Sequence, residues 1–215
     1  RRPLSLQIEK FVTGSYKQNC YVVGNTVGNA LVIDPGSDAD GISAILDKNG
    51  WCPLAIIATH AHFDHVGAAA DLMDRYNIPF YLDDRDSRLL ESINLYKMIV
   101  DGSGALRVPE VTNNLADIDS YFEIGPFKIN FISTPGHTPG GVCFLIDHHI
   151  FTGDTILPAG VGRIDLPGGD AEEMVRSLVL LAELPSDLLA YPGHGPVIPF
   201  VELLHTAKSI GFHPQ

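Results

Sequence analysis

Cysteine is scarce in this chain, and its three cysteines are scattered. Cys20, Cys52 and Cys143 form no Cys-x-x-Cys pair. A disulfide framework needs an even number of cysteines and a thiolate zinc site needs closely spaced ones, so the sequence suggests neither. Each cysteine lies beside apolar residues or within a strand-like run, where we expect it to pack in the core. This usage favours a reducing compartment.

Positive charge is also in short supply. Fourteen lysines and arginines stand against 26 aspartates and glutamates, which gives a formal net charge of −12. Such an acidic surface repels phosphate backbones, so we expect no nucleic-acid partner. Two bound divalent cations would add four positive charges to this total and bring it to about −8.

Long apolar runs are absent as well. No run approaches the roughly 18 residues that a membrane-spanning helix needs. The segment from Arg1 to Ser5 lacks the apolar stretch of a signal peptide. We therefore expect a cytoplasmic protein with no membrane partner. No repeat or Gly/Ser linker divides the 215 residues, and the sequence predicts a single domain over 1–215.

What the chain does have is an alternation of short β-branched runs with helical patterns. The predicted strands are 4–12, 20–23, 30–33, 54–58, 78–81, 121–124, 127–132, 141–146, 149–152 and 188–191. The predicted helices are 38–48, 65–76, 87–100, 170–182 and 200–210. Asp170 and Glu173 have the spacing of a capping box at the start of the fourth helix. The stretch 101–119 contains Gly, Pro and Asn and is predicted to be a loop that could edge a pocket.

Segments rich in His, Asp and Gly follow four of the predicted strands directly. These segments are Thr59-His60, Thr134-Pro135-Gly136-His137, Gly153-Asp154 and Pro192-Gly193-His194. Loops at the ends of a rigid sheet are where proteins commonly hold functional groups in fixed positions. We therefore expect these side chains to belong to one site.

The densest group of candidate ligands is the run Thr59-His60-Ala61-His62-Phe63-Asp64-His65. In an extended segment, residues two apart point the same way, so His60 and His62 can converge on one ion. Asp64 and His65 lie where the chain should turn into a helix and can face a second ion beside the first. Imidazole and carboxylate ligands at this density suit zinc, iron or manganese rather than calcium.

The motifs together resemble the metallo-β-lactamase superfamily, over nearly the whole chain. The resemblance rests on Val32-Ile33-Asp34-Pro35-Gly36, His60-Ala61-His62-Phe63-Asp64-His65, Pro135-Gly136-His137-Thr138-Pro139-Gly140, Thr152-Gly153-Asp154 and Pro192-Gly193-His194-Gly195-Pro196. It implies an αββα sandwich, an α/β fold that agrees with the alternation of strands and helices.

The resemblance also implies a role for each matched residue. One metal ion is expected on His60, His62 and His137. The other is expected on Asp64, His65 and His194, with Asp154 bridging the two ions, and we count Asp64 as catalytic too. Asp34 is expected to support the metal loop from outside the ligand set. Zinc is the expected metal, and iron or manganese can occupy the same ligands.

Two divalent ions held about 3.5–4 Å apart lower the pKa of a shared water toward neutrality and so supply hydroxide for hydrolysis. A thiolate is a weakly basic leaving group, so a thioester needs little help from a general acid. The sequence shows no Gly-x-Ser-x-Gly elbow, which argues against a serine nucleophile. We therefore expect hydrolysis without a covalent intermediate.

The last-histidine loop, Pro192-Gly193-His194-Gly195-Pro196, resembles that of glyoxalase II enzymes. This resemblance implies a thioesterase whose substrate is S-lactoylglutathione or a related acyl thiol. Arg163, in Gly160-Val161-Gly162-Arg163, is similar in position to a residue that binds the glutathione moiety, and could instead pair with Asp165. The main alternative is a persulfide dioxygenase with a single iron, whose last loop typically reads Pro-Ala-His-Asp. A metal-binding module without catalysis has no positive sign.

Overall fold

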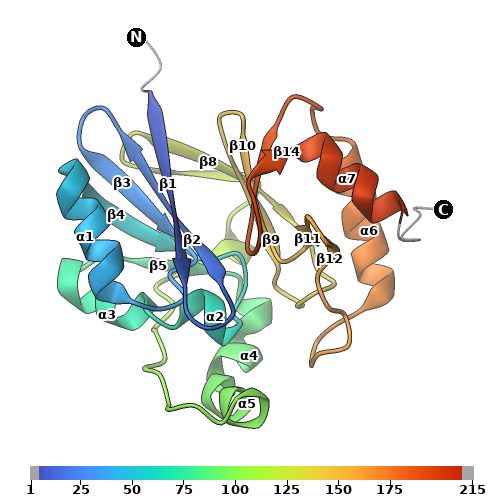
Figure 1. Cartoon of the computed structure of the whole chain (residues 1–215), viewed down its shortest axis with the longest axis horizontal. Helices are drawn as coiled ribbons and strands as arrows, with labels where there is room; N and C mark the ends of the chain where they lie inside the picture. Colours follow the sequence, from blue (N-terminus) through green and yellow to red (C-terminus); the bar gives the residue numbers. More distant parts are fainter. Residues whose placement is uncertain (1–4, 210–215) are drawn as a thin grey trace.

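The computed structural model describes residues 5–209, and its helices and strands form four layers in the order helix, sheet, sheet, helix (Figure 1). The first sheet has the order β1-β2-β3-β4-β5-β6. Its strands are Leu6–Thr13, Gln18–Asn25, Asn29–Ile33, Cys52–Ile57, Phe80–Leu82 and Asn113–Asn114. β1 to β3 pair antiparallel, whereas β3 to β6 pair parallel.

The second sheet has the order β14-β13-β10-β9-β8-β7. Its strands, in that order, are Ile198–Pro199, Leu189–Pro192, His149–Gly153, Val142–Ile146, Phe127–Ser133 and Tyr121–Ile124. β10 and β13 pair parallel, and the other neighbours pair antiparallel. β11 (Ile156–Leu157) and β12 (Gly160–Val161) form a separate small hairpin next to this sheet.

Helices cover the outer faces of both sheets. On the first sheet they are α1 (Ala39–Asn49) and α3 (Ala69–Tyr76), and on the second α6 (Ala171–Ala182) and α7 (Phe200–Ser209). The remaining helices are α2 (Phe63–Val66), α4 (Ser87–Glu91), α5 (Ile93–Val100), η1 (Asp84–Asp86) and η2 (Leu115–Asp117). α4 and α5 project from the bottom of Figure 1, away from the layers. Within residues 5–209, no helix has the length and apolar character needed to cross a membrane.

The core explains the layering. In β3, Leu31 and Ile33 face the space between the two sheets, while Val32 faces the helices of the first side. This alternation follows from the two-residue period of a strand, and it lets one buried strand serve two layers of core. A third apolar cluster joins the second sheet to α6 and α7. The predicted αββα sandwich is therefore confirmed.

The predicted strands are all present, with described ends shifted by at most two residues; Leu4 and Ile210 fall outside the described residues. The prediction of one helix over 65–76 is wrong. The chain forms α2 and α3 with a break at Gly67 and Ala68. The amide of Ala68 donates to the carbonyl of Pro35. A Cβ on Gly67 would lie 2.3 Å from the carbonyl oxygen of Gly36, so contact with the β3–α1 loop sets the break.

Two further helix predictions need correction. The helix predicted over 87–100 is divided at Ser92 into α4 and α5, because Ser92 has a φ of −94° and a ψ of 8°, outside the helical range. The capping box is only half formed. The Asp170 carboxylate accepts from the amide of Glu173, but the Glu173 carboxylate pairs with Arg176. The amide of Asp170 instead donates to the carbonyl of Gly136, which anchors the third-histidine loop to α6.

Candidate metal centre

The seven predicted ligands lie together at one end of the two sheets. The loop after β4 and the short helix α2 carry His60, His62, Asp64 and His65. The segments after β8, β10 and β13 of the other sheet carry His137, Asp154 and His194. Each sheet thus contributes to the same cluster, as loops leaving the ends of neighbouring strands can.

The ligand atoms form two adjacent groups. His60, His62 and His137 make one group, and Asp64, His65, Asp154 and His194 make the other. Within each group, one candidate ligand atom per residue lies within 4.8 Å of the others. This spacing allows each group to surround one cation.

The carboxylate of Asp154 lies between the two groups. Its Oδ2 atom is 3.9 Å from His60 Nε2 and 3.5 Å from His137 Nε2 on one side. On the other side it is 3.4 Å from His194 Nε2, and Oδ1 is 3.3 Å from His65 Nε2. Only 8% of Asp154 is exposed. Among residues 5–209, Asp154 is therefore the one carboxylate that lies within 4 Å of histidines of both groups.

Hydrogen bonds on the outside of the cluster fix which ring nitrogen faces inward. The Asp34 carboxylate accepts from the amide of Thr59 at 2.7 Å, from its hydroxyl at 2.6 Å, and from His65 Nδ1 at 2.9 Å. Because the Thr59 hydroxyl donates to Asp34, it accepts from His60 Nδ1, 3.0 Å away. Both histidines therefore direct Nε2 inward, and loss of any proton from Nε2 gives the form that binds a metal.

Main-chain carbonyls orient two further histidines in the same way. His137 Nδ1 donates to the carbonyl of Arg163 at 2.6 Å, and His194 Nδ1 donates to that of Tyr16 at 3.0 Å. A carbonyl can only accept, so each ring carries a proton on Nδ1, and Nε2 is the atom that points inward for a ligand bond. Neither carbonyl could be identified from the sequence, because a main-chain contact does not depend on residue type.

The inward atoms fit cations. Within residues 5–209, Nε2 of His60, His62, His65 and His137 and Oδ1 of Asp154 are buried and have no hydrogen-bond partner. Leaving one such group unsatisfied costs about 1–3 kcal/mol. Five of them around one cavity make sense if cations bind there. Nitrogen and carboxylate ligands without a thiolate suit zinc, iron and manganese.

The two groups differ in their electrostatics. Burial, reinforced by neighbouring histidine rings, holds the pKa of His60 well below its usual range and lowers that of His62 to about 4. Burial also opposes charge on His65 and His194, but the carboxylates of Asp154 and Asp64 outweigh it. The pKa of His65 is well above its usual range, and that of His194 is raised to about 10. Without cations, His60 and His62 are therefore neutral at neutral pH, whereas His65 and His194 hold protons.

Asp86 ties two of the ligand loops together, and sequence reasoning missed it. Its buried carboxylate accepts from the amide of Ala61 at 3.0 Å, the hydroxyl of Thr138 at 2.9 Å and the amide of Gly140 at 2.6 Å. Ala61 lies between the first two histidines, and Thr138 and Gly140 lie one and three residues after the third. One side chain therefore sets the spacing of all three rings of the first group.

The position before the last histidine leaves no room for a side chain. A Cβ on Gly193 would lie 2.2 Å from Oδ1 of Asp154 and 2.8 Å from the His65 ring. A side chain there would displace the central carboxylate. The motif Pro192-Gly193-His194 therefore keeps space for the cluster as well as supplying a ligand.

A cavity of about 260 Å³ opens over the ligand atoms. Its walls include Tyr16, Phe63, Tyr96, Leu157, Arg163 and Leu166. The guanidinium of Arg163 is exposed and makes two hydrogen bonds of 2.9 Å to the Asp165 carboxylate. Arg163 thus lines the cavity over the ligand atoms, but its charge is paired with Asp165, the alternative that the sequence left open; its role in substrate binding stays a prediction.

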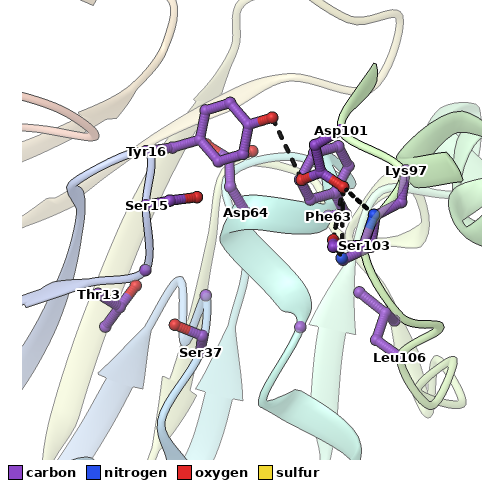
Figure 2. Close-up of a pocket in the computed structure, with 13 residues that line it drawn as sticks. Thr13, Ser15, Tyr16, Ser37, Phe63, Asp64, Lys97, Asp101, Ser103 and Leu106 are labelled. Atoms are coloured by element: carbon purple, nitrogen blue, oxygen red, sulfur yellow. Dashed lines mark hydrogen bonds and ion pairs between the residues drawn. The ribbon is translucent and has the colours of Figure 1, made fainter. Parts of the chain in front are cut away.

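A smaller cavity of about 210 Å³ lies beside Asp64, between the β1–β2 turn and the C-terminal end of α5 (Figure 2). The ring of Tyr16 packs edge-on against Phe63, and its hydroxyl donates to Asp101 at 3.2 Å. Asp101 also pairs with Lys97 at 3.7 Å. Asp101 begins the stretch predicted as a pocket-edging loop, and the structure has it at the edge of this cavity.

Sequence comparison with known proteins identifies a matching family and several relatives. A family profile for the metallo-beta-lactamase superfamily matches residues 13–194. The probable metallo-hydrolase YqgX of Bacillus subtilis is 38% identical over 77% of this chain and 80% of its own. The hydroxyacylglutathione hydrolase GloC of Haemophilus influenzae is 29% identical over 88% of this chain and 91% of its own.

Solved structures agree with these relatives. BLEG-1, described as a B3 metallo-beta-lactamase, superposes with a TM-score of 0.88 at 29% identity, covering 95% of this chain and all of its own. TTHA1623, solved in a di-iron-bound form, gives 0.81 at 33% identity over 92% of this chain and 98% of its own. Together with a His/Asp cluster typical of dinuclear metallo-hydrolases, these matches establish that the chain belongs to the metallo-beta-lactamase superfamily.

Proposed function

We propose that the chain is a dinuclear metal-dependent thioesterase that hydrolyses S-lactoylglutathione or a related acyl thiol. The observation that carries the dinuclear part is the position of Asp154, whose carboxylate contacts both groups of ligand atoms. These residues would hold two divalent cations, which would supply a hydroxide at neutral pH and polarise the substrate carbonyl.

The protein's own contribution is positioning. Asp34, Thr59 and Asp86 hold the histidine rings in place through the hydrogen bonds described above, so little reorganisation is needed when charge develops. Asp64 lies 3.2 Å from His194 Nε2 and lines the cavity over the cluster. Its carboxylate is therefore placed to bind a cation and to orient a water in front of the substrate.

The thioester part rests on two weaker supports. The loop Pro192-Gly193-His194-Gly195-Pro196 is similar to that of glyoxalase II enzymes, and one relative is named as a hydroxyacylglutathione hydrolase. A thiolate leaves without protonation, so the reaction needs no dedicated general acid. Zinc is the proposed metal, and the di-iron form of TTHA1623 makes iron the first alternative to test.

Metal analysis of the purified chain, followed by a panel of thioesters, β-lactams and glutathione persulfide, tests the proposal. We expect two ions per chain and hydrolysis of S-lactoylglutathione or another thioester. Asp64→Ala should abolish this activity, and Asp84→Ala, which changes an exposed aspartate outside the ligand cluster, should retain it. One iron per chain with oxygen uptake on the persulfide would instead identify a dioxygenase, and turnover of β-lactams alone would identify a lactamase.

A further inference from the structure

A second, larger cavity adjoins the metal centre. It has a volume of about 500 Å³, which is within the range of small-molecule binding sites. α4 and α5 form one wall, and the loops after His137 and before α6 form the other. Its apolar lining includes Leu89, Ile93, Leu95, Ile99, Pro139 and Pro167. The metal chemistry described above uses none of these residues.

The two cavities share a boundary. His62 and Tyr96 line both, and their rings are stacked at a centroid distance of 5.8 Å with 12° between the planes. A molecule whose reacting carbonyl lies over the metal ligands can therefore extend past Tyr96 into the larger cavity. Continuity with the ligand cluster points to an arm of the substrate as the occupant.

One face of α5 is built for an apolar occupant. Ser92, Leu95, Tyr96 and Ile99 follow the spacing of a single helix face and all line the cavity. Leu95 is 58% exposed and Ile99 is 72% exposed. Met98 on the same helix is similarly exposed, at 60%, but does not line the cavity.

The cavity also contains one available positive charge. Arg85 and Arg88 both line it. Arg85 donates to Asp83 at 2.9 Å and to the Ser133 hydroxyl at 2.8 Å. The guanidinium of Arg88 makes no hydrogen bond or ion pair within residues 5–209. Arginine binds carboxylates through two parallel hydrogen bonds, so Arg88 can receive an anionic group.

We propose that this cavity binds the acyl arm of the substrate, and that the arm is apolar and ends in a carboxylate held by Arg88. This inference rests on the proposed thioesterase activity, and it favours a related acyl thiol over S-lactoylglutathione, whose short hydroxylated acyl group has no carboxylate. The arm is the acyl part because a peptide-like thiol such as glutathione carries amides and charges, which would lose their hydrogen bonds to water between the apolar side chains of this cavity.

The test is the acyl-chain dependence of kcat/KM on glutathione thioesters with acetyl, butanoyl, octanoyl and octanedioyl groups. Each buried methylene raises kcat/KM by up to about fourfold, so we expect octanoyl to exceed acetyl by roughly tenfold or more. Ile99→Asp should lower the octanoyl-to-acetyl ratio by about tenfold. Met98→Asp, which makes the same change one residue away, should leave the ratio and both rates unchanged.

Arg88→Met tests the charged end. The wild type should prefer octanedioyl over octanoyl, and the variant should lose this preference. Acetyl hydrolysis with a flat chain-length profile, or equal effects of Ile99→Asp and Met98→Asp, would overturn the inference and leave the thioesterase proposal standing. Inactivity on every thioester, the acetyl one included, would overturn both. Thermal denaturation of each variant checks that all are folded.

Discussion

The metal centre and the wall formed by α4 and α5 are built in opposite ways. His60, His65 and Asp154 are almost completely buried, and Nδ1 of each of the two rings is hydrogen-bonded to another side chain. On the wall, Leu95 and Ile99 are largely exposed and make no polar contact with their side chains. A dense hydrogen-bond network fixes geometry, whereas loosely packed apolar side chains can change without strain. The contrast suggests that catalysis and substrate choice reside in separable parts of the molecule.

The largest effect should come from removing the carboxylate that lies between the two ligand groups. Asp154→Ala removes the one carboxylate that contacts both groups, so we expect kcat/KM to fall by far more than the roughly 10- to 100-fold typical of residues behind the ligands. Elemental analysis should show fewer than two ions per chain. Full metal content with near-normal activity would mean that Asp154 does not join the two groups.

The next largest effect tests Asp86, whose hydrogen bonds hold two of the ligand loops in place. In Asp86→Asn, the amide nitrogen faces at least one of the donors that the carboxylate now accepts, so the loops carrying the first group should shift. We expect kcat/KM or metal affinity to fall by about 10- to 100-fold. Chelator competition measures the affinity, and the matched control is Asp84→Asn, on the exposed neighbour. Equal behaviour of the two variants would remove Asp86 from the positioning network.

Lowering the pH should weaken cation binding at the two ligand groups to different extents. In the metal-free chain the pKa of His62 is about 4, so it stays neutral well below neutral pH, while the pKa of His194 is about 10, so it is protonated at neutral pH. A cation in the second group must therefore displace protons, and its affinity should fall first as the pH is lowered. Calorimetry in buffers of different ionisation enthalpy measures the proton release. Binding of two ions without proton release would contradict this difference.

The smallest effect is expected at the contact between Tyr16, beside the metal centre, and Asp101, at the end of α5. Tyr16→Phe removes the hydrogen bond to Asp101 but keeps the main-chain carbonyl that accepts from His194. The lost bond is partly exposed, so the free energy of unfolding should fall by less than about 1 kcal/mol. We expect kcat/KM to change only a few-fold, measured beside urea unfolding. A hundredfold loss would show that the wall and the centre are not separable.

Sequence reasoning succeeded best where structure depends on local pattern. The strands followed from short β-branched runs, the His- and Asp-rich segments followed from strand ends, and the full set of seven ligands followed from the resemblance to the metallo-β-lactamase superfamily. These signals are carried by the residues themselves, so they can be read without knowing the tertiary contacts. The roles of those seven residues as ligands remain a prediction for the metal analysis.

The features that were missed depend on contacts between distant segments. Asp86 stands in a run with Asp83 and Asp84, and only the fold distinguishes the one that reaches two ligand loops. The break after α2 depends on a hydrogen bond from Ala68 to the carbonyl of Pro35, more than thirty residues earlier in the chain. The large cavity arises where α4 and α5 meet loops from the C-terminal half, which no local pattern records.

The ligands come from both halves of the chain, and neither ligand group is complete within one half. His60 and His62 precede the exposed loop around Gly104 while His137 follows it, and the second group is divided in the same way, two residues on each side. If the polypeptide were severed at Gly104, neither fragment could build a full site alone. Cations should then strengthen reassociation of the fragments, because they would act as cross-links between the two pieces in addition to the apolar core between the sheets.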